Sequence, residues 1–160
     1  MRGGDGELKY SIDTSSLITP WRFHYPPDRF PSIWHRLEDL IRSGDLRASP
    51  MVLAELERGE DALYQWCCAQ ADFSVPPDET EQQHVRDIVR DYPGLIKPGE
   101  DRIDADPFVI AFAMRHGLTV VTQEATKGQG YQSKIPYVCS RLGVRCMDTL
   151  GLFADCGWTF

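Results

Sequence analysis

The sequence of 160 residues lacks any long hydrophobic run. No stretch approaches the roughly 20 apolar residues that a membrane-spanning helix needs. The opening residues, MRGGDGELKY, also lack the apolar segment of a signal peptide. We therefore expect neither a membrane span nor a secretory leader, and we predict a soluble protein of the cytoplasm.

Cysteines in a paired pattern are also missing. The chain has five cysteines, an odd number, and Cys67 and Cys68 are adjacent. This arrangement suits neither a disulfide framework nor the spacing of a zinc site. A catalytic thiol at Cys139 or Cys146 would need a nearby base, and none of the four histidines lies in a recognisable partner motif. We expect reduced thiols without a catalytic role.

Positive charge is scarce, because 17 lysines and arginines face 24 aspartates and glutamates, for a formal net charge of −7. Proteins that coat nucleic acid depend on many contacts from Lys and Arg to phosphates, so that class is excluded. Nucleic acid as a substrate is not excluded. Divalent cations held by carboxylates would supply positive charge locally.

What the sequence does contain is enough apolar residues, 42%, for the core of a single domain spanning residues 1–160. Apolar or β-branched runs predict strands at residues 8–12 and 118–122, and shorter ones at 45–49 and 144–148. Helical periodicity or helix-terminal residues predict helices over 31–44, 49–59, 61–73, 80–92, 106–117, 134–143 and 149–157, with a short helical segment from residue 15.

Proline, glycine and capping residues mark the ends of several predicted helices. Pro31 suits a first helical position, and Ser49, Asp106 and Thr149 are the expected N-caps of their helices. Gly117 is the expected stop after the Ala-rich helix, which is the most apolar of the chain. The segment TPWRFHYPPDRFP, residues 19–31, is expected to form an irregular aromatic loop.

The alternation of strands and helices predicts an α/β sandwich with a mainly parallel central sheet. Ligands of such sheets bind beyond the carboxyl ends of the strands. Asp13 and Glu124 both follow predicted strands directly, so we expect both side chains at that edge of the sheet.

Four acids lie beside apolar sequence: Asp13, Glu55 within a helix, Asp106 at a helix start, and Glu124. Carboxylates that converge from separate elements repel one another unless a cation joins them, and Mg²⁺ and Mn²⁺ prefer oxygen ligands. A metal site accounts for all four together. Each acid also has a purely structural explanation, as a turn residue, a solvated helix residue, an N-cap or a surface loop residue.

The segments IDTSSLI, VLAELERG, DADPFVIAFA and VVTQE, in this order, resemble those of PIN-domain proteins. With YPPDRFPSIWHRL and KIPYVCSRLGVRC, the chain resembles more narrowly the PIN-like group DUF4411. The resemblance spans most of the chain. It implies a three-layer α/β/α sandwich whose acids bind Mg²⁺ or Mn²⁺ and cleave RNA phosphodiester bonds.

By this resemblance Asp13, Glu55, Asp106 and Glu124 are the metal-binding and catalytic acids, although aspartate is commoner than glutamate at the last position. Asp104 is a substitute or supporting partner of Asp106. Ser15 and Thr122 are supporting polar residues near a metal-bound water or phosphate. The implied reaction is metal-assisted hydrolysis that leaves 3′-hydroxyl and 5′-phosphate ends. Many small PIN proteins are toxins, which makes an antitoxin partner and a homodimer further expectations.

Two groups of residues have alternative roles. Four basic residues are either phosphate contacts or a solvated face: Lys127, Lys134, Arg141 and Arg145. Four aromatic residues are either a partner surface or, as we favour, packing over the sheet: Trp21, Phe23, Tyr25 and Phe30.

Two other functions fit the sequence less well than a nuclease. A haloacid-dehalogenase-type phosphatase needs a second aspartate at the position that Ser15 occupies, and the glycines of GGDG precede the first strand, where a dinucleotide-binding loop would follow it. The alternative that stays open is a PIN-like binding or regulatory protein that keeps metal ligands without nuclease turnover. The glutamate at position 124 is the feature that favours it.

Overall fold

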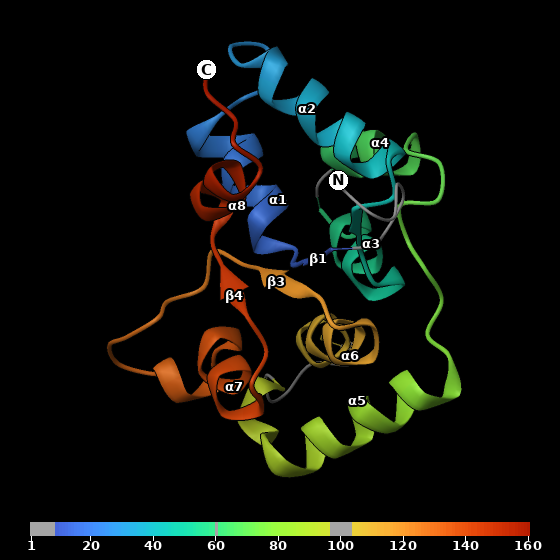
Figure 1. The fold of residues 1–160 in the computed structure, drawn as a ribbon, viewed down its shortest axis with the longest axis vertical. Helices are drawn as coiled ribbons and strands as arrows, with labels where there is room; N and C mark the ends of the chain where they lie inside the picture. The colour runs from blue at the N-terminus through green and yellow to red at the C-terminus, as the bar shows by residue number, and fades with distance from the viewer. Residues whose placement is uncertain (1–8, 60, 97–103) are drawn as a thin grey trace.

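A four-stranded, all-parallel sheet lies at the centre of the computed structural model, which describes residues 9–59, 61–96 and 104–160 (Figure 1). The strand order is β2-β1-β3-β4. Tyr10 lies opposite both Leu46 and Thr119, and Val120 lies opposite Cys146. The strands are β1 (Tyr10–Ile12), β2 (Leu46–Arg47), β3 (Thr119–Val121) and β4 (Cys146–Met147). The first predicted strand began at residue 8, which lies outside the described residues.

Helices cover both faces of the sheet and form the three layers of an α/β/α fold, as the resemblance implied (Figure 1). On one face lie α1 (Ser15–Thr19), α2 (Pro31–Arg42) and α8 (Thr149–Asp155). On the other lie α6 (Asp106–His116) and α7 (Ile135–Leu142), with α5 (Glu79–Asp91) packed outside α6. The remaining α-helices are α3 (Pro50–Glu57) and α4 (Asp61–Cys68), beside β2.

Helix α6 is the buried centre of its layer, as its apolar sequence predicted. Its residues 109–113 are all buried, and the Ser11 hydroxyl of β1 donates to the carbonyl of Val109 at 2.9 Å. Gly117 ends the helix with φ at +69°, a left-handed conformation that glycine adopts without steric cost. In the described residues, no helix combines the length and hydrophobicity needed to cross a membrane.

Four local expectations were wrong. The segment after α1 is not wholly irregular, because Pro20–His24 continues as a π-helix. Asp106 is the first helical residue, and Ala105 takes the N-cap position. Thr149 likewise begins α8, and the N-cap is Asp148, whose carboxylate accepts from the Gly151 N–H at 2.8 Å. The helix predicted over 61–73 also ends early, at Cys68.

The N-terminal aromatic residues mainly pack, although two of them remain exposed. Trp21 contacts Trp34 and Trp66, with ring centroids 4.8 and 6.2 Å apart. Tyr25 lies 5.6 Å from Phe153 by ring centroids. Two side chains stay largely in solvent: Phe23 at 72% exposure and Phe30 at 42%. The five cysteines, all within the described residues, are free thiols.

Candidate metal site

Asp13 lies at the carboxyl end of β1, in the middle of the sheet. Its backbone N–H continues the ladder to β3 by donating to the carbonyl of Val121 at 2.8 Å. Only 2% of the residue is exposed. The Oδ2 atom of Asp13 accepts from the Ser15 hydroxyl at 2.7 Å and from the Thr122 hydroxyl at 2.9 Å. The two hydroxyls therefore fix one carboxylate oxygen and leave Oδ1 as the oxygen that can serve a ligand.

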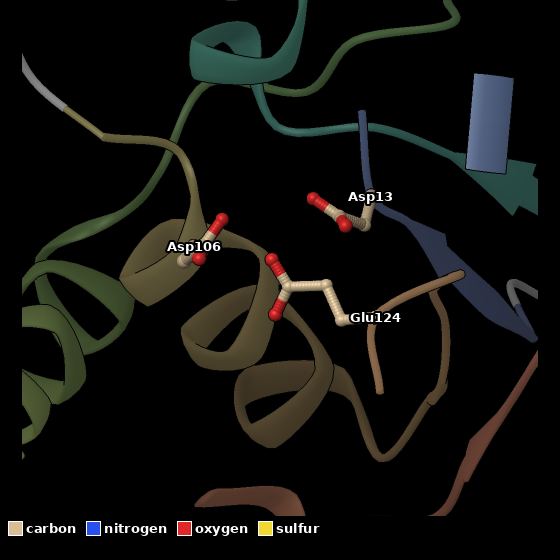
Figure 2. A group of neighbouring side chains, drawn as sticks. All are labelled: Asp13, Asp106 and Glu124. Carbon is tan, nitrogen blue, oxygen red and sulfur yellow. The ribbon is translucent and has the colours of Figure 1, made fainter. Parts of the chain in front are cut away.

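Two further acids meet Asp13 at this point. Asp106 extends from the first turn of α6, and Glu124 follows β3 by three residues. One carboxylate oxygen of each of the three residues lies within 4.8 Å of the others. Figure 2 shows the three side chains pointing toward one another from three separate elements. The parallel topology brings them together, because the ends of β1 and β3 and the start of α6 share one edge of the sheet.

Two hydrogen bonds fix the position of Glu124. Its own N–H donates to the Thr122 hydroxyl at 3.2 Å, and its Oε1 accepts from the N–H of Ile135 at 2.8 Å. Ile135 begins α7, where backbone N–H groups lack helical partners and favour a carboxylate. The longer glutamate side chain thus reaches a helix terminus and the acidic cluster at once.

Glu55 lies beside the cluster, but its carboxylate is not one of the three that lie within 4.8 Å of one another. Its Oε1 accepts from the Thr14 hydroxyl at 2.5 Å, and its Oε2 accepts from the N–H of Ala105 at 3.0 Å. The carboxylate of Glu55 therefore ties α3 to the start of α6 and to the residue after Asp13. Asp104 is 5% exposed and lines the same cavity.

An open cavity of about 290 Å³ contains these acids. Among its described lining residues the one basic side chain is that of Arg58, which the sequence analysis missed. Arg58 follows Glu55 by three residues, a spacing that puts both side chains on one helix face. This spacing was the sequence signal that could have placed Arg58 beside the acids. The basic residues that the sequence suggested do not line it: Lys127, Lys134, Arg141 and Arg145. Arg145 precedes β4 and lines a different cavity.

The electrostatics of the cluster favour a cation. Burial is the main cause that raises the pKa of Asp13 from 3.8 to about 6, and the Glu124 carboxylate acts in the same direction. The hydroxyl bonds from Ser15 and Thr122 lower it, because they stabilise the ionised form. A bound cation would relieve the repulsion between these carboxylates and keep all of them ionised.

The donor set fits Mg²⁺ or Mn²⁺ in chemistry and in size. All three ligand atoms are carboxylate oxygens, the type that these hard cations prefer. Around Mg²⁺, adjacent oxygens lie about 3.0 Å apart and opposite oxygens about 4.2 Å apart. The oxygens of Asp13, Asp106 and Glu124 lie within 4.8 Å of one another, so the three side chains would move closer together around a shared cation.

Comparison with known families confirms the DUF4411 part of the resemblance. Residues 10–160 match the family described as a domain of unknown function, DUF4411. The match covers nearly the whole chain, and the protein belongs to this family. No curated protein matches the chain significantly.

Proposed function

We propose that this protein is a divalent-metal-dependent ribonuclease of the PIN type. The observation that carries the proposal is the convergence of Asp13, Asp106 and Glu124 within 4.8 Å at the carboxyl edge of a parallel sheet. The PIN assignment is part of the proposal, and it is supported by the order of the acids along the chain and by the three-layer fold.

Each residue of the site has a task in phosphodiester hydrolysis. Asp13, Asp106 and Glu124 would hold Mg²⁺ or Mn²⁺, which supplies a Lewis acid that lowers the pKa of a water and stabilises negative charge on the phosphate. Ser15 and Thr122 fix the orientation of the Asp13 carboxylate. Arg58 is the lining residue that can pair with a phosphate oxygen.

Metal binding without turnover is the second candidate function. It is favoured by the bonds that Glu55 and Glu124 make inside the protein, because three of their four carboxylate oxygens accept from protein donors. These bonds reduce the ligands left for a second metal ion. The antitoxin partner and the homodimer stay predictions, and unchanged toxicity and solubility on co-expression with the genomic neighbour would count against the antitoxin.

The test of nuclease function is cleavage of a mixed, end-labelled RNA pool in the presence of Mg²⁺ or Mn²⁺. We expect cleavage by the wild type and a loss of at least about a hundredfold for Asp106→Asn, which removes one ligand charge. Asp87→Asn, an exposed acid of α5, is the matched control and retains activity. Equal cleavage by wild type and Asp106→Asn would assign the activity to a contaminant.

A further inference from the structure

A second and larger cavity adjoins the metal site. Its volume is about 520 Å³, within the range of small-molecule sites, and Glu124 and Thr122 form the wall next to the acidic cluster. Glu124 also lines the metal cavity, so a ligand can extend from one space into the other. The residues of interest on its other walls are Gln123, Tyr131, Pro136, Val144, Met147 and Asp148.

Gln123 presents an amide whose orientation is fixed. Its Oε1 accepts from the Thr149 N–H at 2.7 Å and from the Thr149 hydroxyl at 2.9 Å. The Thr149 N–H can only donate, so it identifies that end of the amide as the carbonyl oxygen. The Nε2 amide group is therefore the polar end left for a ligand, and it has no hydrogen-bond partner within the described part of the chain.

Asp148 supplies an acceptor on the same wall. Its Oδ1 accepts from the N–H of Gly151 as the N-cap of α8, and this bond orients the carboxylate. A side chain at position 151 would begin with a Cβ only 3.3 Å from Oδ1, so glycine leaves room for the cap. Gln123 and Asp148 thus offer the cavity a fixed donor and a fixed acceptor.

The remaining walls suit a flat ring. Tyr131 is half-buried and packs edge-on against Tyr137, with ring centroids 5.4 Å apart and planes at 83°. This contact holds the Tyr131 ring in place, and an aromatic face is a platform on which any base can stack. Pro136, Val144 and Met147 add apolar surface.

The charge of the cavity selects the part of a nucleotide that can enter. Among the described lining residues there is no lysine or arginine, whereas Glu124 and Asp148 are acidic. A phosphate or carboxylate would be repelled. A neutral ring with donors and acceptors on its edge meets no such repulsion.

We propose that this cavity binds one nucleobase of single-stranded RNA, next to the phosphate held at the metal site; the choice of RNA rests on the proposed nuclease function. Tyr131 stacks on the base, while Gln123 Nε2 donates to the base edge and Asp148 accepts from it. Base edges in single strands are read by this combination of stacking and edge hydrogen bonds. The backbone N–H of Gln123 donates to the Ser15 hydroxyl at 2.9 Å, which ties the base site to the residues around Asp13.

The probe is guanosine, because its edge carries two N–H donors beside a carbonyl acceptor and it has no phosphate. Saturation-transfer NMR with the full chain in a chelating buffer measures its binding without metal or cleavage. We expect binding by the wild type, a loss of about tenfold or more for Tyr131→Ala, and recovery in Tyr131→Phe, which restores the ring. Ribose, which lacks a base, is the ligand control.

Gln123→Glu separates edge recognition from folding. Its carboxylate accepts from Thr149 as the amide does but cannot donate, so guanosine affinity falls while the unfolding temperature stays close to that of the wild type. Arg42→Ala, exposed on α2 and outside the cavity, leaves binding unchanged.

The outcomes separate the two proposals. Guanosine binding that is absent in the wild type, or equal in the wild type, Tyr131→Ala and Gln123→Glu, overturns the base site even if RNA is cleaved. Guanosine binding that depends on Tyr131 and Gln123 and persists in Asp106→Asn supports the base site, even if neither metal binding nor cleavage is found.

Discussion

At the scale of single residues, the carboxylate of Asp13 depends on two hydroxyls for its orientation. The hydroxyl bonds from Ser15 and Thr122 stabilise the ionised form against burial. Residues that orient a metal ligand in this way typically change metal affinity 10- to 100-fold when they are removed. Ser15 and Thr122 are therefore as much part of the site as the acids.

We expect Ser15→Ala to weaken Mn²⁺ binding by about tenfold at pH 7.5, because it removes the 2.7 Å bond to Asp13. Isothermal titration calorimetry measures the change. Ser16→Ala is the matched control, since the buried Ser16 hydroxyl has no hydrogen-bond partner among the described residues. If both variants bind Mn²⁺ like the wild type, Ser15 does not position Asp13.

Glu81 makes stability depend on pH. It is 1% exposed, and its Oε2 has no hydrogen-bond partner among the described residues. Burial, followed by the Asp78 carboxylate, raises its pKa from 4.5 to about 7. Since the folded pKa lies above the unfolded one, the stabilising contribution of the protonated group is present below pH 4.5 and is lost as the pH rises through 7.

Glu81→Gln removes this loss, because glutamine does not ionise. We expect its free energy of unfolding, relative to the wild type, to rise by roughly 3 kcal/mol between pH 4.5 and pH 8. Urea denaturation at the two pH values measures it. Glu79→Gln, exposed on the same helix, keeps the wild-type pH dependence. If the unfolding free energies of Glu81→Gln and the wild type differ by the same amount at both pH values, Glu81 titrates normally.

At the scale of secondary-structure elements, sequence predicts what local signals encode. Pro31 begins its helix and Gly117 ends its helix, as expected. Both effects are local, because proline restricts the backbone and glycine permits a left-handed conformation. Asp106 and Thr149 are each one residue past the N-cap, and at α8 the adjacent Asp148 caps the helix. Bonds to distant residues at both helix starts were not predictable locally: Glu55 accepts from the Ala105 N–H, and Gln123 accepts from the N–H and the hydroxyl of Thr149.

The same distinction applies to the site. Asp13 and Glu124 could be placed from strand ends and parallel topology alone. The role of Glu55 could not, because its hydrogen bonds depend on where α3 lies against α6. Arg58 and the cavity around Gln123 likewise depend on packing between elements that are remote in sequence.

Glu55→Gln tests whether this residue joins elements or binds metal. The glutamate carboxylate has two acceptor oxygens, whereas the glutamine amide has only one, so the variant loses one of the two hydrogen bonds. We expect a loss of about 1–2 kcal/mol in the free energy of unfolding. Mn²⁺ affinity should fall less than in Asp106→Asn, because both Glu55 oxygens already accept from Thr14 and Ala105. Calorimetry that finds equal losses in the two variants would make Glu55 a direct ligand.

At the scale of the whole molecule, the net charge of −7 opposes contact with RNA. A divalent cation at the acidic cluster reverses the local charge where the phosphate must bind. We expect filter binding of a short single-stranded RNA to strengthen when Ca²⁺ or Mg²⁺ replaces a chelator at matched ionic strength. The gain should be absent in Asp106→Asn. A gain of the same size in this variant would show that the cation acts elsewhere.

The central claim is that Asp13, Asp106 and Glu124 form one divalent-metal site, and calorimetric titration of Mn²⁺ into the wild type and Asp13→Asn tests it most directly. The account predicts saturable binding by the wild type and none by Asp13→Asn, with both proteins folded by circular dichroism. Saturable binding of equal affinity by the two proteins, or none by the wild type, would contradict it.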